Sequence, residues 1–160
     1  MKHIDPSNDW PPVWKESYQY DLCEVFGRHE SNPGYANAYR ARSDVALSLL
    51  QSALPAGSRV LVVAAAQGNF TLRMAEMGYR VTWNDLRAEL ADYVRLKHEF
   101  GDVTYAPGNV FELQFDQPFD GVLITEIIEH VAHPDESLPP RPTAAPPAGT
   151  VLVTPTLSTY

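Results

Sequence analysis

The sequence predicts a single α/β domain built on a doubly wound, mostly parallel sheet with strand order 3-2-1-4-5. Short β-branched runs alternate with longer segments whose apolar residues recur at helical spacing. That pattern is typical of parallel sheets with right-handed crossovers. The chain has 160 residues, which is enough for one domain with a substantial core.

Composition, charge and cysteine content narrow the class of protein. Hydrophobic residues make up 44% of the chain, and 12 basic against 20 acidic residues give a net charge of −8. The acidic balance disfavours a broad nucleic-acid interface, because phosphate binding needs clustered Lys and Arg. The lone Cys23 excludes an internal disulfide and fits a reducing compartment. No signal peptide or run of roughly 20 apolar residues is present, so we expect a cytoplasmic protein without membrane association.

The N-terminal residues 1–34 are rich in aromatic residues and prolines. We predict an irregular arm there, with a short helix possible over 14–26. Trp10 and Trp14 are expected to fix the arm to the remainder of the fold.

The main domain is predicted to span 35–160 and to open with an amphipathic helix over 35–54. Pro55 and Gly57 end this helix. Its apolar residues recur at helical spacing and are predicted to face inward: Ala38, Ala41, Val45, Leu49 and Leu50.

Strands and crossover helices then alternate along the chain. The predicted strands are "RVLVVA" (59–64), "YRVTW" (79–83), a short strand within "DVTYAPGNV" (102–110), "FDGVLITEII" (119–128), which runs into a short helix, and "TVLVT" (150–154). The predicted helices are "NFTLRMAEMG" (69–78) and "LRAELADYVRLKHEFG" (86–101). Residues 134–149 break the rhythm with six prolines. Each proline costs about 3 kcal/mol inside a helix, so a loop or polyproline segment is expected there.

The turn after the first strand carries the strongest functional signal. In "VLVVAAAQGNFTLRMAEMGYRVTWNDL" (60–86), a strand leads through small residues into a helix, and the next strand ends in Asp85. Small residues let a ligand approach the backbone, and the N-terminus of the helix attracts negative charge. The carboxylate of Asp85 can accept hydrogen bonds from ribose hydroxyls. A dinucleotide motif would need a glycine where Asn69 stands, whereas an S-adenosylmethionine motif in this register needs glycines at 64, 66 and 68.

These segments resemble the class I S-adenosylmethionine-dependent methyltransferases over roughly residues 35–155. The resemblance is carried by the stretch just quoted and by "YAPGNVFELQF", "FDGVLITEIIEHVAHPDESL" and "AGTVLVTP". It implies a Rossmann-like methyltransferase fold, S-adenosylmethionine as cofactor and a small-molecule methyl acceptor. It also implies cofactor contacts from Ala64, Ala66, Gly68, Asp85, Leu86, Asn109 and Val110, with Gly68 at the methionine part, Asp85 at the ribose, and Asn109 and Val110 bordering adenine.

The chain departs from the family at the first strand and its turn. Val62 replaces an acid that helps to hold the amino group of the cofactor, and Ala64 and Ala66 replace glycines. Alanine is tolerated where the backbone φ is negative. Glu126, at the end of the fourth strand, is expected to supply the missing negative charge.

The segment "EIIEH" places Glu126, Glu129 and His130 on one face of a helix. His130 is the candidate catalytic residue, as a general base. The spacing is similar to the metal motif of small-RNA 2′-O-methyltransferases, but it also occurs in small-molecule methyltransferases that need no metal. We therefore expect no metal ion.

The segment "YANAYRAR" precedes the first strand. Tyr35, Tyr39 and Arg42 could cover the cofactor, with Arg42 neutralising the cofactor carboxylate. A helix that simply packs on the sheet is equally compatible with this segment.

Two other functions remain open. One is a catalytically degenerate or truncated domain that binds S-adenosylmethionine or a nucleotide, favoured by Val62, Ala64 and Ala66. The other is a fragment of a nicotinamide-dependent oxidoreductase, disfavoured by Asn69. Family members continue past the fifth strand, so we expect this chain to be incomplete at its C-terminus, with the terminal strands missing. The sequence leaves the methyl acceptor and the oligomeric state open.

Overall fold

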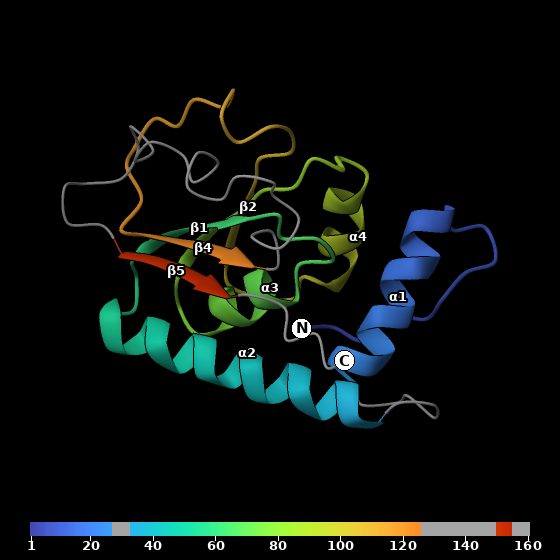
Figure 1. Cartoon of the computed structure of the whole chain (residues 1–160). Coiled ribbons are helices and arrows are strands. Elements are labelled where there is room, and N and C mark those ends of the chain that lie inside the picture. The colour runs from blue at the N-terminus through green and yellow to red at the C-terminus, as the bar shows by residue number, and fades with distance from the viewer. Residues whose placement is uncertain (27–32, 126–149, 155–160) are drawn as a thin grey trace, which may run out of the picture.

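A five-stranded parallel sheet forms the centre of the computed structural model, which describes residues 1–26, 33–125 and 150–154. The strand order is β3-β2-β1-β4-β5, as predicted (Figure 1). The strands are β1 (Arg59–Val63), β2 (Arg80–Trp83), β3 (Asp102–Tyr105), β4 (Gly121–Thr125) and β5 (Thr150–Thr154).

The order of the strands reverses around β1, which pairs with β2 on one side and with β4 on the other. Val62 lies in register with Trp83 of β2 and with Leu123 of β4. Because the strands are parallel, the segments that follow them leave the sheet at the same edge, the one formed by the carboxyl ends of the strands. In open α/β sheets this edge is where ligands bind.

The middle of the central strand is hydrophobic because both of its faces are covered. Val60, Leu61 and Val62 are at most 1% exposed. Val60 and Val62 belong to the large core that the sheet shares with the helices. Leu61 packs on the other face with Phe119 and with Val122 and Ile124 of β4. Burial on both faces explains the continuous apolar run that predicted this strand.

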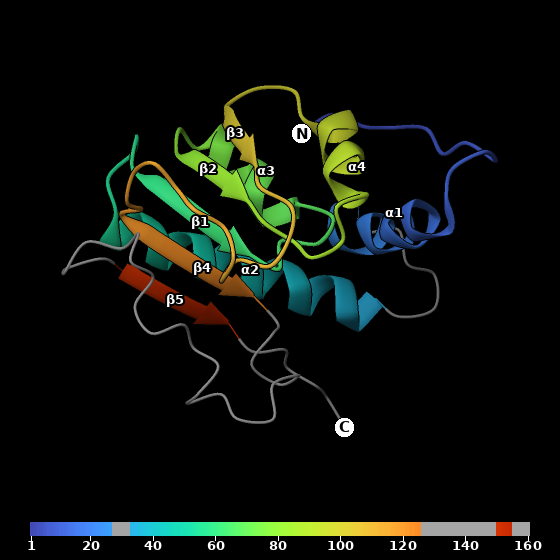
Figure 2. The ribbon, with the colours of Figure 1, turned by 90° about the horizontal axis from the view of Figure 1, so that it is seen from above.

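The described residues form four helices: α1 (Pro12–Glu24), α2 (Pro33–Ala53), α3 (Asn69–Glu76) and α4 (Leu90–Lys97). The long α2 contacts β5, and α3 contacts β2 and β3. Helix α1 contacts α2 and α4 and lies beyond the end of the sheet to which the strand arrows point (Figures 1 and 2). The N-terminal segment thus reaches the edge where a ligand is expected.

The structure corrects the predicted face of α2. Val45 and Leu49, predicted to face inward, are 60% and 51% exposed, and Ala38 and Ala41 are exposed as well. Only Leu50 of the predicted set is buried. The buried stripe instead includes Ala36, Tyr39, Ser43, Ala46, Leu47 and Leu50.

Helix α4 is shorter than the predicted helix over 86–101. The backbone N–H of Arg87 donates to Asp85 Oδ1 at 2.9 Å. This side-chain contact forms a local turn that competes with helix formation, so α4 begins only at Leu90.

Candidate cofactor site

The loop between β1 and α3 holds three residues in the left-handed region. The φ angles are 50° at Ala64, 45° at Ala66 and 77° at Gly68. These are the three positions at which the family motif has glycine. The condition of negative φ is therefore not met at Ala64 and Ala66, and each alanine carries backbone strain of about 1 kcal/mol or more.

Hydrogen bonds from the second strand hold this strained loop. Trp83 Nε1 donates to the carbonyl oxygen of Ala66 at 3.0 Å, and the N–H of Ala66 donates to Asp85 Oδ2 at 2.9 Å. The N–H of Ala65 donates to the carbonyl oxygen of Asn84 at 2.8 Å. Each residue from 83 to 85 thus contacts the loop, which explains how the strained conformation persists.

Gly68 is required by packing as well as by its φ angle. A Cβ atom built on Gly68 would lie 2.7 Å from both methyl carbons of Val94 in α4. Gly68 is the N-cap of α3, so the close approach of α4 fixes where that helix begins. A side chain at this position would require Val94 to move.

Asp85 lies buried at the end of β2, with 4% of its surface exposed. Its Oδ1 accepts hydrogen bonds from the backbone N–H and from Nε of Arg87, at 2.9 and 3.0 Å. The hydrogen bond to Asp85 raises the pKa of the Arg87 guanidinium, against the opposing effect of burial. The carboxylate is thereby held as an ordered acceptor beside the loop.

A cavity of about 360 Å³ opens beside the loop and Arg87. Aromatic rings, loop backbone and two charged side chains share its wall. The lining residues are Tyr20, Glu24, Tyr35, Tyr39, Ala64, Ala65, Ala66, Gln67, Asn69, Phe70 and Arg87. The predicted residues Tyr35 and Tyr39 are among them, while the guanidinium of Arg42 lies over the Tyr39 ring at 5.3 Å.

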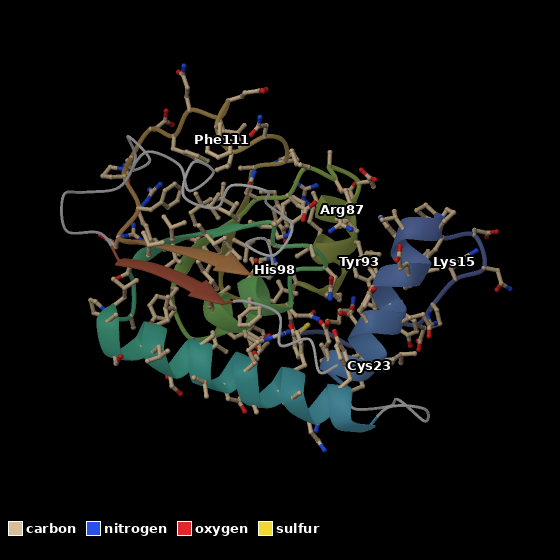
Figure 3. All side chains as sticks on the ribbon, in the orientation of Figure 1. Lys15, Cys23, Arg87, Tyr93, His98 and Phe111 are labelled. Atoms are coloured by element: carbon tan, nitrogen blue, oxygen red, sulfur yellow. The ribbon has the colours of Figure 1, made fainter. Side chains whose placement is uncertain are left out.

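A buried polar network attaches α1 to this loop. Lys97 Nζ donates to Asp21 Oδ2 at 2.7 Å and to Asn69 Oδ1 at 2.8 Å, and Tyr93 Oη donates to Asp21 Oδ2 at 2.7 Å. Burial lowers the pKa of Lys97, opposed by the charge of Asp21. Tyr93 lies between α4 and α1 (Figure 3), where burial and then the charge of Asp21 raise its pKa.

The same network continues to the cavity wall through Asn69 and Gln67. Asn69 Nδ2 donates to Asp21 Oδ1 at 2.8 Å and to Glu24 Oε2 at 2.9 Å. Gln67 Nε2 donates to Glu24 Oε2 at 2.7 Å. The polar residues at the ends of α1 and α4 therefore position the side chains that follow the strained loop.

Aromatic contacts provide a second attachment for the N-terminal segment. The rings of Trp10 and Trp14 pack on Tyr93 with centroids 5.9 and 5.7 Å apart. Trp14 Nε1 also donates to the carbonyl oxygen of Glu89 at 2.9 Å. These contacts give the two tryptophans the anchoring role expected of them.

Of the predicted cofactor residues that the structure describes, only Ala64 and Ala66 belong to the cavity wall, and Gly68 and Asp85 lie beside it. The other predicted site residues lie elsewhere or outside the described part of the chain. Leu86 is 75% exposed. Asn109 donates from Nδ2 to Glu112 at 3.0 Å, and Val110 packs against the smaller core cluster. Glu126 and His130 fall in residues 126–149, outside the described residues.

Four residues of this site were not predicted from the sequence: Asp21, Glu24, Arg87 and Lys97. Only Arg87 carried a local signal, because it stands two positions after the acid of the second strand. In residues 1–26, 33–125 and 150–154, no group of three His, Cys, Asp or Glu side chains is placed to hold a metal ion. Within the same ranges, no helix combines the length and apolar character needed to cross a bilayer.

Comparison with known proteins gives a consistent family. A family model described as a methyltransferase domain matches residues 60–138. A ubiquinone biosynthesis O-methyltransferase of Xanthomonas campestris pv. campestris (strain B100) is 35% identical over 105 residues, covering 63% of this chain and 44% of that protein. An uncharacterized methyltransferase of Staphylococcus carnosus (strain TM300) is 33% identical over 141 residues, covering 86% of this chain and 58% of the relative. The chain thus spans about half the length of these relatives.

Solved structures share the fold. Coclaurine N-methyltransferase bound to N-methylheliamine and SAH matches with a TM-score of 0.65 at 16% identity, covering 90% of this chain and 52% of the other. At this identity the similarity establishes the fold alone. Together with the sequence relatives, the matching family model identifies residues 60–138 as a methyltransferase domain of the class I S-adenosylmethionine-dependent type.

Proposed function

We propose that the protein transfers a methyl group from S-adenosylmethionine to an oxygen, nitrogen or carbon atom of a small molecule. The observation that carries the proposal is the loop of Ala64, Ala66 and Gly68 beside the buried Asp85, at the edge of the sheet next to a cavity of about 360 Å³. The O-methyltransferase and N-methyltransferase named above support a small-molecule acceptor.

The chemistry of the residues present fits this cofactor. Asp85 offers carboxylate oxygens to ribose hydroxyls if Arg87 turns away from it, and the start of α3 at Asn69 offers backbone N–H groups. The rings of Tyr20, Tyr35, Tyr39 and Phe70 on the cavity wall suit a cation, because aromatic faces attract positive charge.

When bound, the cofactor supplies a methyl group on a positively charged sulfur atom. The role of the protein is then to hold that sulfur and the acceptor atom in line and to exclude water, which is a proximity effect. We further propose His130 as the base that removes a proton from the acceptor, with Asp85, Leu86, Asn109 and Val110 around the adenosine part.

Calorimetric titration with S-adenosylhomocysteine and with NAD tests the cofactor class. We expect S-adenosylhomocysteine to bind with one site per chain and NAD to give no heat of binding. Binding of NAD alone would instead support the oxidoreductase alternative, and binding of neither ligand would contradict the proposal. Methyl transfer from labelled cofactor to phenols and to amines would then identify the acceptor atom.

A further inference from the structure

Glu24 brings a carboxylate from the N-terminal helix to the cavity wall. It is the last residue of α1 and is 6% exposed. Among the described residues that line the cavity, Glu24 is the only one with a carboxylate. Helix α1 lies at the edge of the sheet where the strained loop ends, so this carboxylate faces the loop from a different part of the chain.

The surrounding side chains hold Glu24 in one position. Gln67 and Asn69 donate to its Oε2 at 2.7 and 2.9 Å, and Tyr35 Oη donates to its Oε1 at 3.2 Å. Asn69 is itself fixed by Asp21 and Lys97. A carboxylate whose position is fixed in advance loses little conformational entropy when it binds a ligand.

Val62 stands where the resemblance to the methyltransferase family implies an acid that helps to hold the amino group of the cofactor. Its side chain is 0% exposed, lies within the apolar core and cannot accept a hydrogen bond. A ligand with an ammonium group in this cavity therefore finds no carboxylate at position 62, and a carboxylate from another element can pair with it. The methionine part of S-adenosylmethionine carries such an ammonium group.

We propose that the Glu24 carboxylate binds the ammonium group of the cofactor and takes the place of the acid absent at position 62. This inference rests on the proposed function, since it requires that the cavity accept S-adenosylmethionine or its demethylated product. In this proposal α1, a helix that precedes every strand of the sheet in the sequence, supplies part of the cofactor site.

The test combines two ligands with two proteins. The ligands are S-adenosylhomocysteine and its analogue in which hydrogen replaces the amino group, and the proteins are the unmodified chain and Glu24→Gln. We expect loss of the amino group to weaken binding to the unmodified chain by about 10-fold to 100-fold. In Glu24→Gln, both ligands should bind with nearly the same weakened affinity. Glu99→Gln makes the same chemical change at a side chain that is 48% exposed and outside the cavity wall, so it should behave like the unmodified chain.

The outcomes separate the inference from the proposed function. If Glu24→Gln weakens both ligands by the same factor, Glu24 only positions the loop and the inference is wrong. If the unmodified chain binds both ligands equally, the inference is wrong without any need for a folded variant. If the unmodified chain binds neither ligand, the proposed function fails and the inference fails with it.

Discussion

Arg87 Nε lies 3.0 Å from Asp85 Oδ1, and the backbone N–H of Arg87 lies 2.9 Å from the same oxygen. The carboxylate assigned to the ribose is thus already paired within the chain. Its second oxygen accepts a hydrogen bond from the backbone N–H of Ala66. Asp85 therefore holds the strained loop, and the proposed function gives it a second task, to offer an acceptor to a ligand.

Asp85→Asn should lower both stability and affinity for S-adenosylhomocysteine. The amide keeps the shape but loses the charged hydrogen bonds, each contributing about 1.5–3 kcal/mol. Denaturant unfolding and calorimetry measure the two effects. The control is Asp92→Asn, which breaks the exposed ion pair of Asp92 with Arg95 (2.6 Å) and should change stability by less than about 0.5 kcal/mol. Equal effects of the two substitutions would contradict the role of Asp85.

Ala64→Gly and Ala66→Gly should each stabilise the protein by about 0.5–1 kcal/mol. Glycine adopts positive φ without the steric cost that alanine has, and this gain exceeds its greater loss of entropy on folding. Ala41→Gly is the matched control, because Ala41 is exposed within α2 and glycine there should cost about 1 kcal/mol. Urea unfolding measures all three, and destabilisation by the loop substitutions would show that the loop is unstrained.

Gly68→Ala should destabilise the protein more than Gly57→Ala does. Both glycines have positive φ, 77° and 87°, but a Cβ at Gly57 would meet nothing within 4 Å, whereas at Gly68 it would meet Val94. Gly57→Ala thus measures the backbone strain alone, and the clash should add about 1–3 kcal/mol at Gly68. In a Val94→Ala background this additional loss should shrink, because the clashing methyl groups are gone. An unchanged loss there would mean that the clash with Val94 is not its cause.

The stability of the protein should fall as the pH rises above about 10, in part because of Tyr93. Burial raises the pKa of Tyr93 above the ordinary value of 10.0. Above that pH the unfolded chain releases the phenol proton while the folded chain retains it, so the free energy of unfolding decreases with pH. The contribution is complete below the unfolded pKa and is lost as the pH rises toward the folded pKa.

Comparison with Tyr93→Phe isolates this effect. Tyr79 and Tyr105 also have pKa values raised by burial, and the lowered pKa of Lys97 acts in the opposite direction. All three groups remain in the variant. The difference in unfolding free energy between the two proteins should therefore shrink from pH 8 to pH 11, as measured by guanidinium unfolding. A constant difference would mean that Tyr93 does not titrate differently in the two states.

The sheet could be predicted because its signals are local. The β-branched run of β1, the glycines that follow α3 and α4, and the acid that ends β2 each lie within a short stretch of sequence. The same locality identified the loop and Asp85. Local patterns failed to predict the buried face of α2, because two adjacent stripes of this helix are both apolar. The stripe that packs inward is the one that contains Tyr39 and Ser43.

The polar network could not be predicted from local patterns. Helix α1 buries Ser17, Asp21 and Glu24 together with Tyr18 and Cys23, so its inward face is largely polar and gives no apolar period. Lys97 would ordinarily be assigned to the solvent, but it is 1% exposed. Its burial follows from Asp21, a partner that is distant in the sequence.

The pairing of Asp21 with Lys97 also sets an order of events during protein synthesis. The two residues are 76 positions apart, so a ribosome that adds ~5–20 residues per second makes the lysine about 4 to 15 s after the aspartate. An isolated helix of 13 residues is marginally stable in water, and during this interval the carboxylates of α1 have neither the lysine nor the Tyr93 hydroxyl to bind. Helix α1 therefore docks late, and a nascent chain completes the wall of its cavity only after α4 has left the ribosome.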